Sequence, residues 1–168
     1  MKKNYRLYYL LTAILFLVSF LSACSTKKSF YRKGSGPDYL RFPLLEPYYA
    51  IKITDEYGWQ IPINTDLAQR NFRYYPNILN VTKVAVENGR VMVYSAYPKP
   101  IVLDGGKEKE LHWFILVPDK TETGFEAEEA FISSLQQYGV NQPQWQEPQA
   151  ILKRFDQTGC LEWIPGCK

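Results

Sequence analysis

Apolar and polar residues alternate most regularly between residues 81 and 97, on either side of an Asn88-Gly89 pair. A period of two is typical of a half-buried β-strand, and Asn-Gly is a strong signal for a two-residue hairpin turn. Such a turn fixes the register of the two strands, so we expect Glu87 opposite Arg90. The inner pairs then follow as Val86–Val91, Ala85–Met92 and Val84–Val93, which puts the four valines on one face and the Glu–Arg pair on the other.

Three further apolar segments predict strands. Residues 48–53 and 59–63 flank a turn-like Asp-Glu-Tyr-Gly sequence at 55–58, which predicts a second hairpin. Pro62 cannot donate a backbone hydrogen bond, so it places the second of these strands at a sheet edge or puts Pro62 at a strand end. Residues 111–117 are apolar almost throughout, which predicts a strand that is buried on both faces.

The pattern becomes helical after these strands. Thr123 and Glu126 have the spacing of a capping box, and apolar residues then recur on one helical face up to Gly139, which has the position of a C-terminal cap. This predicts a helix over about 124–138. A short helix is expected within 64–77, and one more short element at 151–155. Several strands and one well-defined helix predict an α+β fold with a mostly antiparallel sheet.

The first 24 residues have the layout of an export signal. Lys2, Lys3 and Arg6 precede an apolar run at 7–21, which is 15 residues long. As a helix this run would measure about 22 Å, against roughly 30 Å for the hydrocarbon core of a bilayer, which disfavours a permanent transmembrane helix. The run ends in Leu21-Ser22-Ala23-Cys24, which resembles the lipobox of bacterial lipoproteins.

The resemblance implies that residues 1–23 are removed and that the Cys24 thiol carries lipid with fatty acyl chains such as palmitate. An ordinary secretory signal or an uncleaved anchor is the alternative. Each buried CH₂ contributes about 0.8 kcal/mol, so two or three acyl chains would hold the chain durably on a membrane. The residue after the cysteine is Ser25 rather than aspartate. The family's sorting pattern then implies the outer membrane of the cell envelope, where the host has two membranes.

Removal of the signal changes the charge of the chain. Of 20 basic residues three lie in the signal, which leaves 17 against 17 acidic residues. Residues 24–38 are expected to form a lipidated tether, and 39–168 a single globular domain. Four of the remaining basic residues lie in this tether: Lys27, Lys28, Arg32 and Lys33. Their side chains are either attracted to anionic lipid or simply solvated. The domain is therefore slightly acidic, and we expect no nucleic-acid partner.

Cysteine usage fits an exported protein. With Cys24 lipidated, Cys160 and Cys167 remain as a pair, separated by six residues that include a Pro-Gly turn signal. Outside the cytoplasm such a pair forms a disulfide, here closing a short C-terminal ring. A redox pair is the weaker interpretation because the spacing is not Cys-x-x-Cys.

Candidate catalytic chemistry is sparse. His112 is the single histidine and lies inside a predicted strand, which favours a hydrogen-bonded structural role. Acidic residues occur at 108 and 110 and again at 126, 128 and 129, and paired carboxylates can do acid–base work as in glycosidases. The second group falls in the first turn of the predicted helix, where acids favour the helix dipole, so a structural role is favoured. The sequence contains neither a serine-hydrolase elbow nor a P-loop. We therefore predict no enzymatic activity, no cofactor and no metal site.

Aromatic residues in turn-like or loop-like segments are the remaining candidates for function: Phe72, Tyr74, Tyr75, Tyr94, Tyr97, Trp145 and Trp163. Of these we single out Tyr74, Tyr75, Tyr97 and Trp145 as a possible binding face, the alternative being that they cap the edge of the core. The leading hypothesis is a membrane-anchored, non-enzymatic interaction or structural module with an envelope protein as partner. The alternative is a small periplasmic ligand-binding or inhibitor domain with a pocket between the sheet and the 124–138 helix. An enzyme comes third.

Overall fold

A computed structural model describes residues 30–32, 36, 39–63, 77–98, 101–102 and 108–167. The chain divides into two units, Met1–Tyr31 and Arg32–Lys168, and the fold below is that of the second. The expected signal, the lipobox with Cys24 and the expected helix within 64–77 lie outside the described residues, apart from Asn77, which begins a strand. In the part that is described, no helix is long and apolar enough to cross a membrane.

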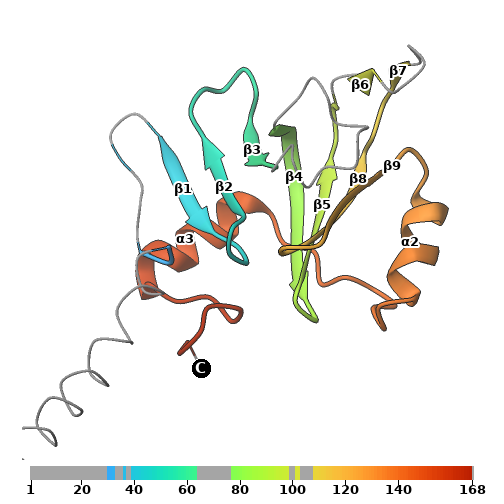
Figure 1. The fold of residues 1–168 in the computed structure, drawn as a ribbon. Coiled ribbons are helices and arrows are strands. Elements are labelled where there is room, and N and C mark those ends of the chain that lie inside the picture. The colour runs from blue at the N-terminus through green and yellow to red at the C-terminus, as the bar shows by residue number, and fades with distance from the viewer. Residues whose placement is uncertain are drawn as a thin grey trace, which may run out of the picture. The chain divides into compact units, whose positions relative to one another are not determined.

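The domain is built on one antiparallel sheet of seven strands (Figure 1). In spatial order they are β1 (Leu40–Pro43), β2 (Tyr49–Lys52), β3 (Trp59–Pro62), β4 (Asn77–Glu87), β5 (Arg90–Ser95), β8 (Trp113–Val117) and β9 (Thr121–Phe125). A separate two-stranded sheet pairs β6 (Ile101–Val102) with β7 (Glu108–Lys109), and two helices follow, α2 (Glu128–Gln136) and α3 (Pro148–Thr158). The expected antiparallel sheet with helix and disulfide is present, but the described chain has two helices rather than one.

The β4–β5 hairpin has the register that the sequence predicts. Glu87 pairs with Arg90, and the Val86–Val91, Ala85–Met92 and Val84–Val93 pairs follow in order. Both turn residues have positive φ, +49° at Asn88 and +72° at Gly89, as a type I′ turn requires. Turn chemistry and alternation therefore fix this element locally.

The β2–β3 hairpin is confirmed as well, with Ile51 opposite Gln60. Pro62 is the last residue of β3, so the strand-end interpretation is correct. The edge interpretation is wrong, because β3 lies between β2 and β4 and pairs with both. A proline at the end of a strand interrupts no continuing ladder, so it is tolerated inside the sheet.

The predicted start of the 124–138 helix is wrong. Thr123 lies in β9, where it pairs with Ile115 of β8, and α2 begins only at Glu128. The two capping-box residues therefore lie in β9 and directly after it. The strand forms because β9 supplies backbone hydrogen-bond partners along the whole of β8. The C-terminal cap is confirmed: Gly139 has φ +71° and donates to the carbonyl of Gln136, and Val140 donates to that of Leu135, as in a Schellman motif.

The short element expected at 151–155 is the 11-residue helix α3. Pro148 occupies its first turn, and Gly159 ends it with φ +68° while donating to the carbonyl of Phe155. Proline at the start and glycine just past the end is the usual asymmetry of helix termini.

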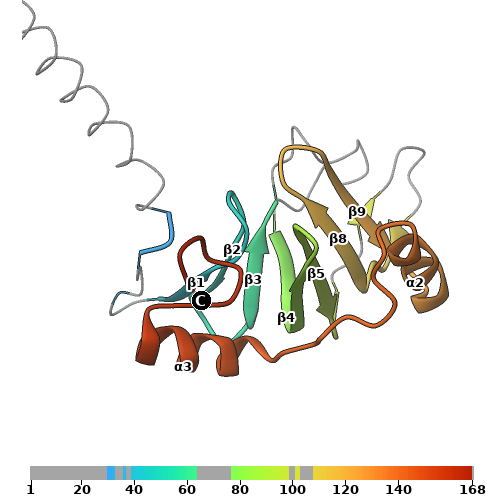
Figure 2. The same ribbon diagram turned by 90° about the horizontal axis from the view of Figure 1, so that it is seen from below.

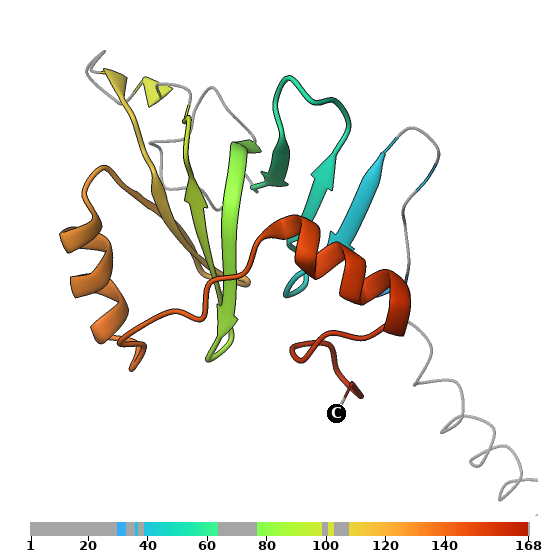
Figure 3. The same ribbon diagram turned by 180° about the vertical axis from the view of Figure 1, so that it is seen from behind.

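Helices α2 and α3 pack near opposite ends of the strand order (Figure 2). α2 packs on β8 and β9, whereas α3 packs on β1 and β4 and lies in front of the β1 side of the sheet in Figure 3. The core beneath α2 consists of Ala85, Met92, Ile115, Phe131, Leu135 and Val140. Alternate residues that face the other way, such as Val84, Val93 and Phe114, are buried too, so β8 is a strand buried on both faces, as predicted.

Candidate functional site

Four rings form an aromatic cluster beside α2: Tyr94, Trp113, Phe131 and Trp145. Tyr94 and Trp113 are cross-strand partners on β5 and β8, and their ring centroids lie 4.3 Å apart. Trp113 also lies 5.3 Å from Phe131 of α2 and 6.0 Å from Trp145. Contacts of this kind add stabilisation beyond the burial of apolar area.

Trp145 is positioned by its neighbour Gln146. The backbone N–H groups and carbonyls of Gln146 and Val84 exchange two hydrogen bonds of 2.9 Å each. β4 is much longer than β3, and its pairing with β3 ends at Val81. The segment after α2 therefore pairs with β4 where β3 no longer does, and this contact delivers the Trp145 ring to the cluster.

The aromatic cluster is only partly covered. Phe131 is buried, whereas Tyr94, Trp113 and Trp145 are half-buried. The exposed Lys83 places its Nζ atom 5.5 Å from the centroid of the Tyr94 ring. The rim of the cluster thus combines aromatic surface with a cation, an arrangement that suits a partner with apolar or aromatic groups.

The four singled-out aromatics do not form one described face. Trp145 joins the aromatic cluster, but Tyr97 is 77% exposed, and its backbone carbonyl accepts a 2.8 Å hydrogen bond from Asn80 Nδ2. Tyr74 and Tyr75, like Phe72, lie outside the described residues. Sequence reasoning placed Trp113 and Phe131 in core elements and missed them as neighbours of Trp145, since no local pattern shows that contact.

His112 is hydrogen-bonded, as expected, but it lies one residue before β8 rather than inside the strand. Its Nδ1 atom lies 3.0 Å from the carbonyl oxygen of Ser95, and its backbone N–H donates to the carbonyl of Phe125. The ring is half-buried and stacks near Tyr94 at 6.2 Å. These contacts hold the start of β8 between β5 and β9.

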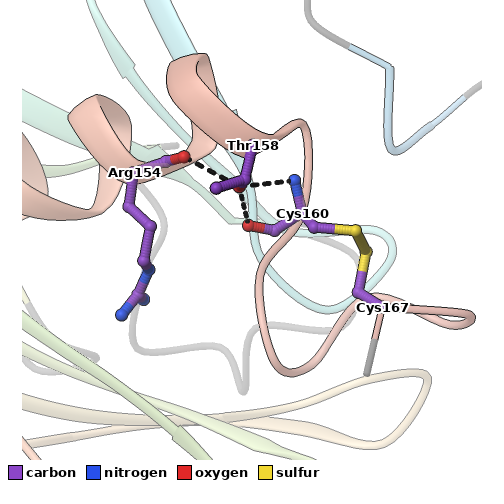
Figure 4. The surroundings of a disulfide bond; sticks show 4 residues. All are labelled: Arg154, Thr158, Cys160 and Cys167. Atoms are coloured by element: carbon purple, nitrogen blue, oxygen red, sulfur yellow. Dashed lines mark hydrogen bonds between the residues drawn. A yellow bond between two sulfur atoms is a disulfide. The ribbon is translucent and has the colours of Figure 1, made fainter.

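Cys160 and Cys167 form the predicted disulfide (Figure 4). The Thr158 hydroxyl oxygen lies 2.8 Å from the carbonyl oxygens of both Arg154 and Cys160 and accepts the Cys160 N–H at 3.0 Å, which joins the end of α3 to the ring. A surface hollow of about 220 Å³ lies beside it. Its Arg154 is engaged with Glu162 at 3.1 Å and Gln146 at 2.8 Å, so this hollow offers no uncommitted cation.

The acidic residues at 126, 128 and 129 lie at the start of α2 or just before it. Glu128 and Glu129 occupy the first turn of α2, as expected, and favour the helix dipole there. Glu126 precedes the helix and forms an ion pair with Lys109. The prediction that placed Glu126 in the first turn is therefore wrong. Among the described residues, no three histidine, cysteine or acidic side chains gather in a way that could hold a metal ion.

One buried acid was not anticipated. Glu122 of β9 and Tyr48, which precedes β2, are 0% and 1% exposed. Burial and the negative charge of Glu122 raise the pKa of the Tyr48 phenol well above its ordinary value, which keeps it neutral. Tyr48 and Glu122 belong to opposite ends of the strand order. The two side chains nevertheless interact, a long-range contact that no sequence pattern signals.

No protein-family model, no curated protein and no solved structure matches this chain.

Proposed function

We propose that the chain is a lipid-anchored protein of the bacterial cell envelope whose domain acts as a non-enzymatic interaction module. The observation that carries the proposal is the sequence Leu21-Ser22-Ala23-Cys24 at the end of a basic and then apolar segment. Lipid on Cys24 keeps the domain at a membrane surface. Ser25 favours the outer membrane where two are present.

The domain supports a binding role through its partly covered aromatic cluster. Half-buried rings such as Trp113, Trp145 and the Tyr94 ring beside Lys83 resemble the anchors that dominate many protein interfaces. A second protein of the envelope is the partner that this surface fits. Because aromatic side chains lose little entropy on binding, a few such rings suffice for a specific contact.

The alternative of a ligand-binding domain with a pocket under α2 is less well supported. The space between this helix and the sheet is occupied by a packed core that includes Met92, Ile115, Phe131 and Leu135, all 0–1% exposed. A ligand would have to displace these side chains. Binding at the surface of the domain therefore fits the described residues better than binding inside it.

The anchor is tested by a Cys24→Ser variant expressed beside a Cys160→Ser/Cys167→Ser double variant. We expect the wild-type chain and the double variant to be processed, to gain the mass of a lipid and to float with membranes, whereas Cys24→Ser should do none of these. Blocking the lipoprotein signal peptidase with globomycin should leave the precursor uncleaved. Unchanged processing under globomycin would contradict the anchor.

The interaction role is tested by in-cell crosslinking from a photoreactive residue at position 145. A discrete crosslinked envelope protein that is lost when Lys83 and Tyr94 are both changed to alanine supports the role, and the same residue at exposed position 156 is the matched control. A purified domain that turns over envelope substrates without any partner would contradict the non-enzymatic proposal.

A further inference from the structure

Exposed apolar side chains concentrate at one corner of the sheet. Among the described residues, the exposed large hydrophobic side chains are Tyr39, Leu40, Ile53 and Tyr97. The first three form what we call the apolar corner, with exposed fractions of 39%, 36% and 58%. Leu40 begins β1 and pairs with Lys52, the last residue of β2, so Tyr39 and Ile53 lie one residue further along the same register.

The apolar corner presents hydrophobic surface on both sides of the sheet, because successive residues of a strand point to opposite faces. Its tyrosine is held in place by Gly36: the backbones of Gly36 and Tyr39 exchange hydrogen bonds of 3.0 and 3.4 Å. A Cβ atom at Gly36 would lie only 2.9 Å from Cε1 of the Tyr39 ring, so the ring lies directly over this glycine. The corner therefore carries apolar side chains on both faces, and the Tyr39 ring packs against Gly36.

Two cations near the corner have partners within the domain. Lys52 Nζ lies 2.6 Å from Asp55 Oδ1, and the Arg41 guanidinium is placed 4.4 Å from the centroid of the Tyr49 ring. Further positive charge comes from the sequence just before the corner, where four basic residues precede Gly34 in the proposed tether. An apolar corner that follows a basic segment in the sequence has the composition of a bilayer-interface contact, in which tyrosine lies at headgroup level and lysine and arginine meet anionic lipid.

The length of chain before the corner identifies its occupant. Only 14 residues separate Cys24 from Tyr39, and a flexible segment of that length reaches about 20 Å on average. We infer that the apolar corner docks edge-on into the surface of the same bilayer that holds the lipid of Cys24, which orients the domain with the start of β1 towards the membrane. This inference rests on the proposed lipid anchor and adds an orientation to it.

The test uses the lipidated full-length mature chain in vesicles of phosphatidylcholine and phosphatidylglycerol. An environment-sensitive fluorophore is attached to Ile53→Cys, or to Tyr97→Cys as the matched control at a more exposed aromatic position. Labelling is specific because lipid blocks Cys24 and the disulfide occupies Cys160 and Cys167. We expect a blue shift and quenching by lipid-borne nitroxide at position 53 and neither at position 97.

A second variant excludes insertion driven by the fluorophore itself. Replacement of Tyr39 and Leu40 by serine should abolish the blue shift at position 53, although the chain still floats with the vesicles. Flotation with no quenching at position 53, or with equal quenching at 53 and 97, overturns the docked orientation and leaves the anchor standing. Failure to float overturns the anchor and the orientation together.

Discussion

The disulfide ring allows the sharpest stability prediction. Replacing both Cys160 and Cys167 by serine opens a ring of eight residues, given their separation of seven. The loop keeps its other native contacts, since Leu161 and Ile164 are 2% and 7% exposed and Trp163 Nε1 donates to the carbonyl of Pro43 at 3.2 Å. The loss of folding stability should therefore arise mainly in the unfolded chain, which gains conformational entropy when the ring is open.

The chain-entropy relation for a ring of this size gives a loss of about 2–3 kcal/mol at 25 °C. For a domain of this length each kcal/mol moves the melting temperature by about 2–4 °C, so we expect a fall of about 5–10 °C. The measurement is urea unfolding followed by fluorescence of the four tryptophans, on the wild-type chain, its reduced form and the double serine variant. The reduced wild-type chain and the double serine variant should have the same free energy of unfolding.

A control separates the ring from the contacts inside it. Leu161→Ala leaves the disulfide intact but removes a side chain that is 2% exposed, and a buried leucine truncation typically costs about 2–5 kcal/mol. Equal midpoints for the oxidised chain and the double serine variant would refute the entropic reasoning. A loss well above that of Leu161→Ala would also refute it, because the loop would then depend on the disulfide for its native contacts.

Three other predictions follow from single positions. Phe131→Ala should destabilise the domain by about 3–5 kcal/mol, because the ring is fully buried under α2, whereas the exposed Tyr97→Ala should change the stability little. Urea unfolding midpoints measure both variants, and similar losses of stability in the two would contradict the described core. Gly139→Ala should cost about 1–2 kcal/mol because φ is +71°, with Gln137→Ala at φ −64° as a neutral control in thermal melts. Folding raises the pKa of Tyr48 above its unfolded value of 10.0, so the unfolded chain releases that proton first and stability should fall as the pH rises through this value. A Tyr48→Phe variant should show a shallower alkaline loss in pH-dependent unfolding, and an unchanged slope would contradict the role of burial.

The local parts of this fold were predictable from the sequence. The register of β4 and β5 depends on Asn88-Gly89 and on alternation over a few residues, and the cap at Gly139 depends on one left-handed residue. The disulfide followed from counting cysteines and from a Pro-Gly turn between them. Each of these features is set by turn geometry or chain connectivity within about ten residues, where tertiary contacts have little to add.

Other features depended on contacts between distant segments. Thr123 and Glu126 satisfy a helix-start pattern, yet hydrogen bonding to β8 makes residues 121–125 a strand. The approach of Trp145 to Trp113 depends on the pairing of Gln146 with Val84.

The sequence by itself therefore determined the hairpins, the strand buried on both faces and the disulfide, whereas the lipid anchor at Cys24 stays a prediction. Only the tertiary structure decided where the helix α2 begins, which aromatic rings meet, and that Glu122 is buried near Tyr48. The physical reason is that period and turn chemistry are local. The backbone partners of an edge strand and the solvation of an acid are instead set by whichever distant segment packs there.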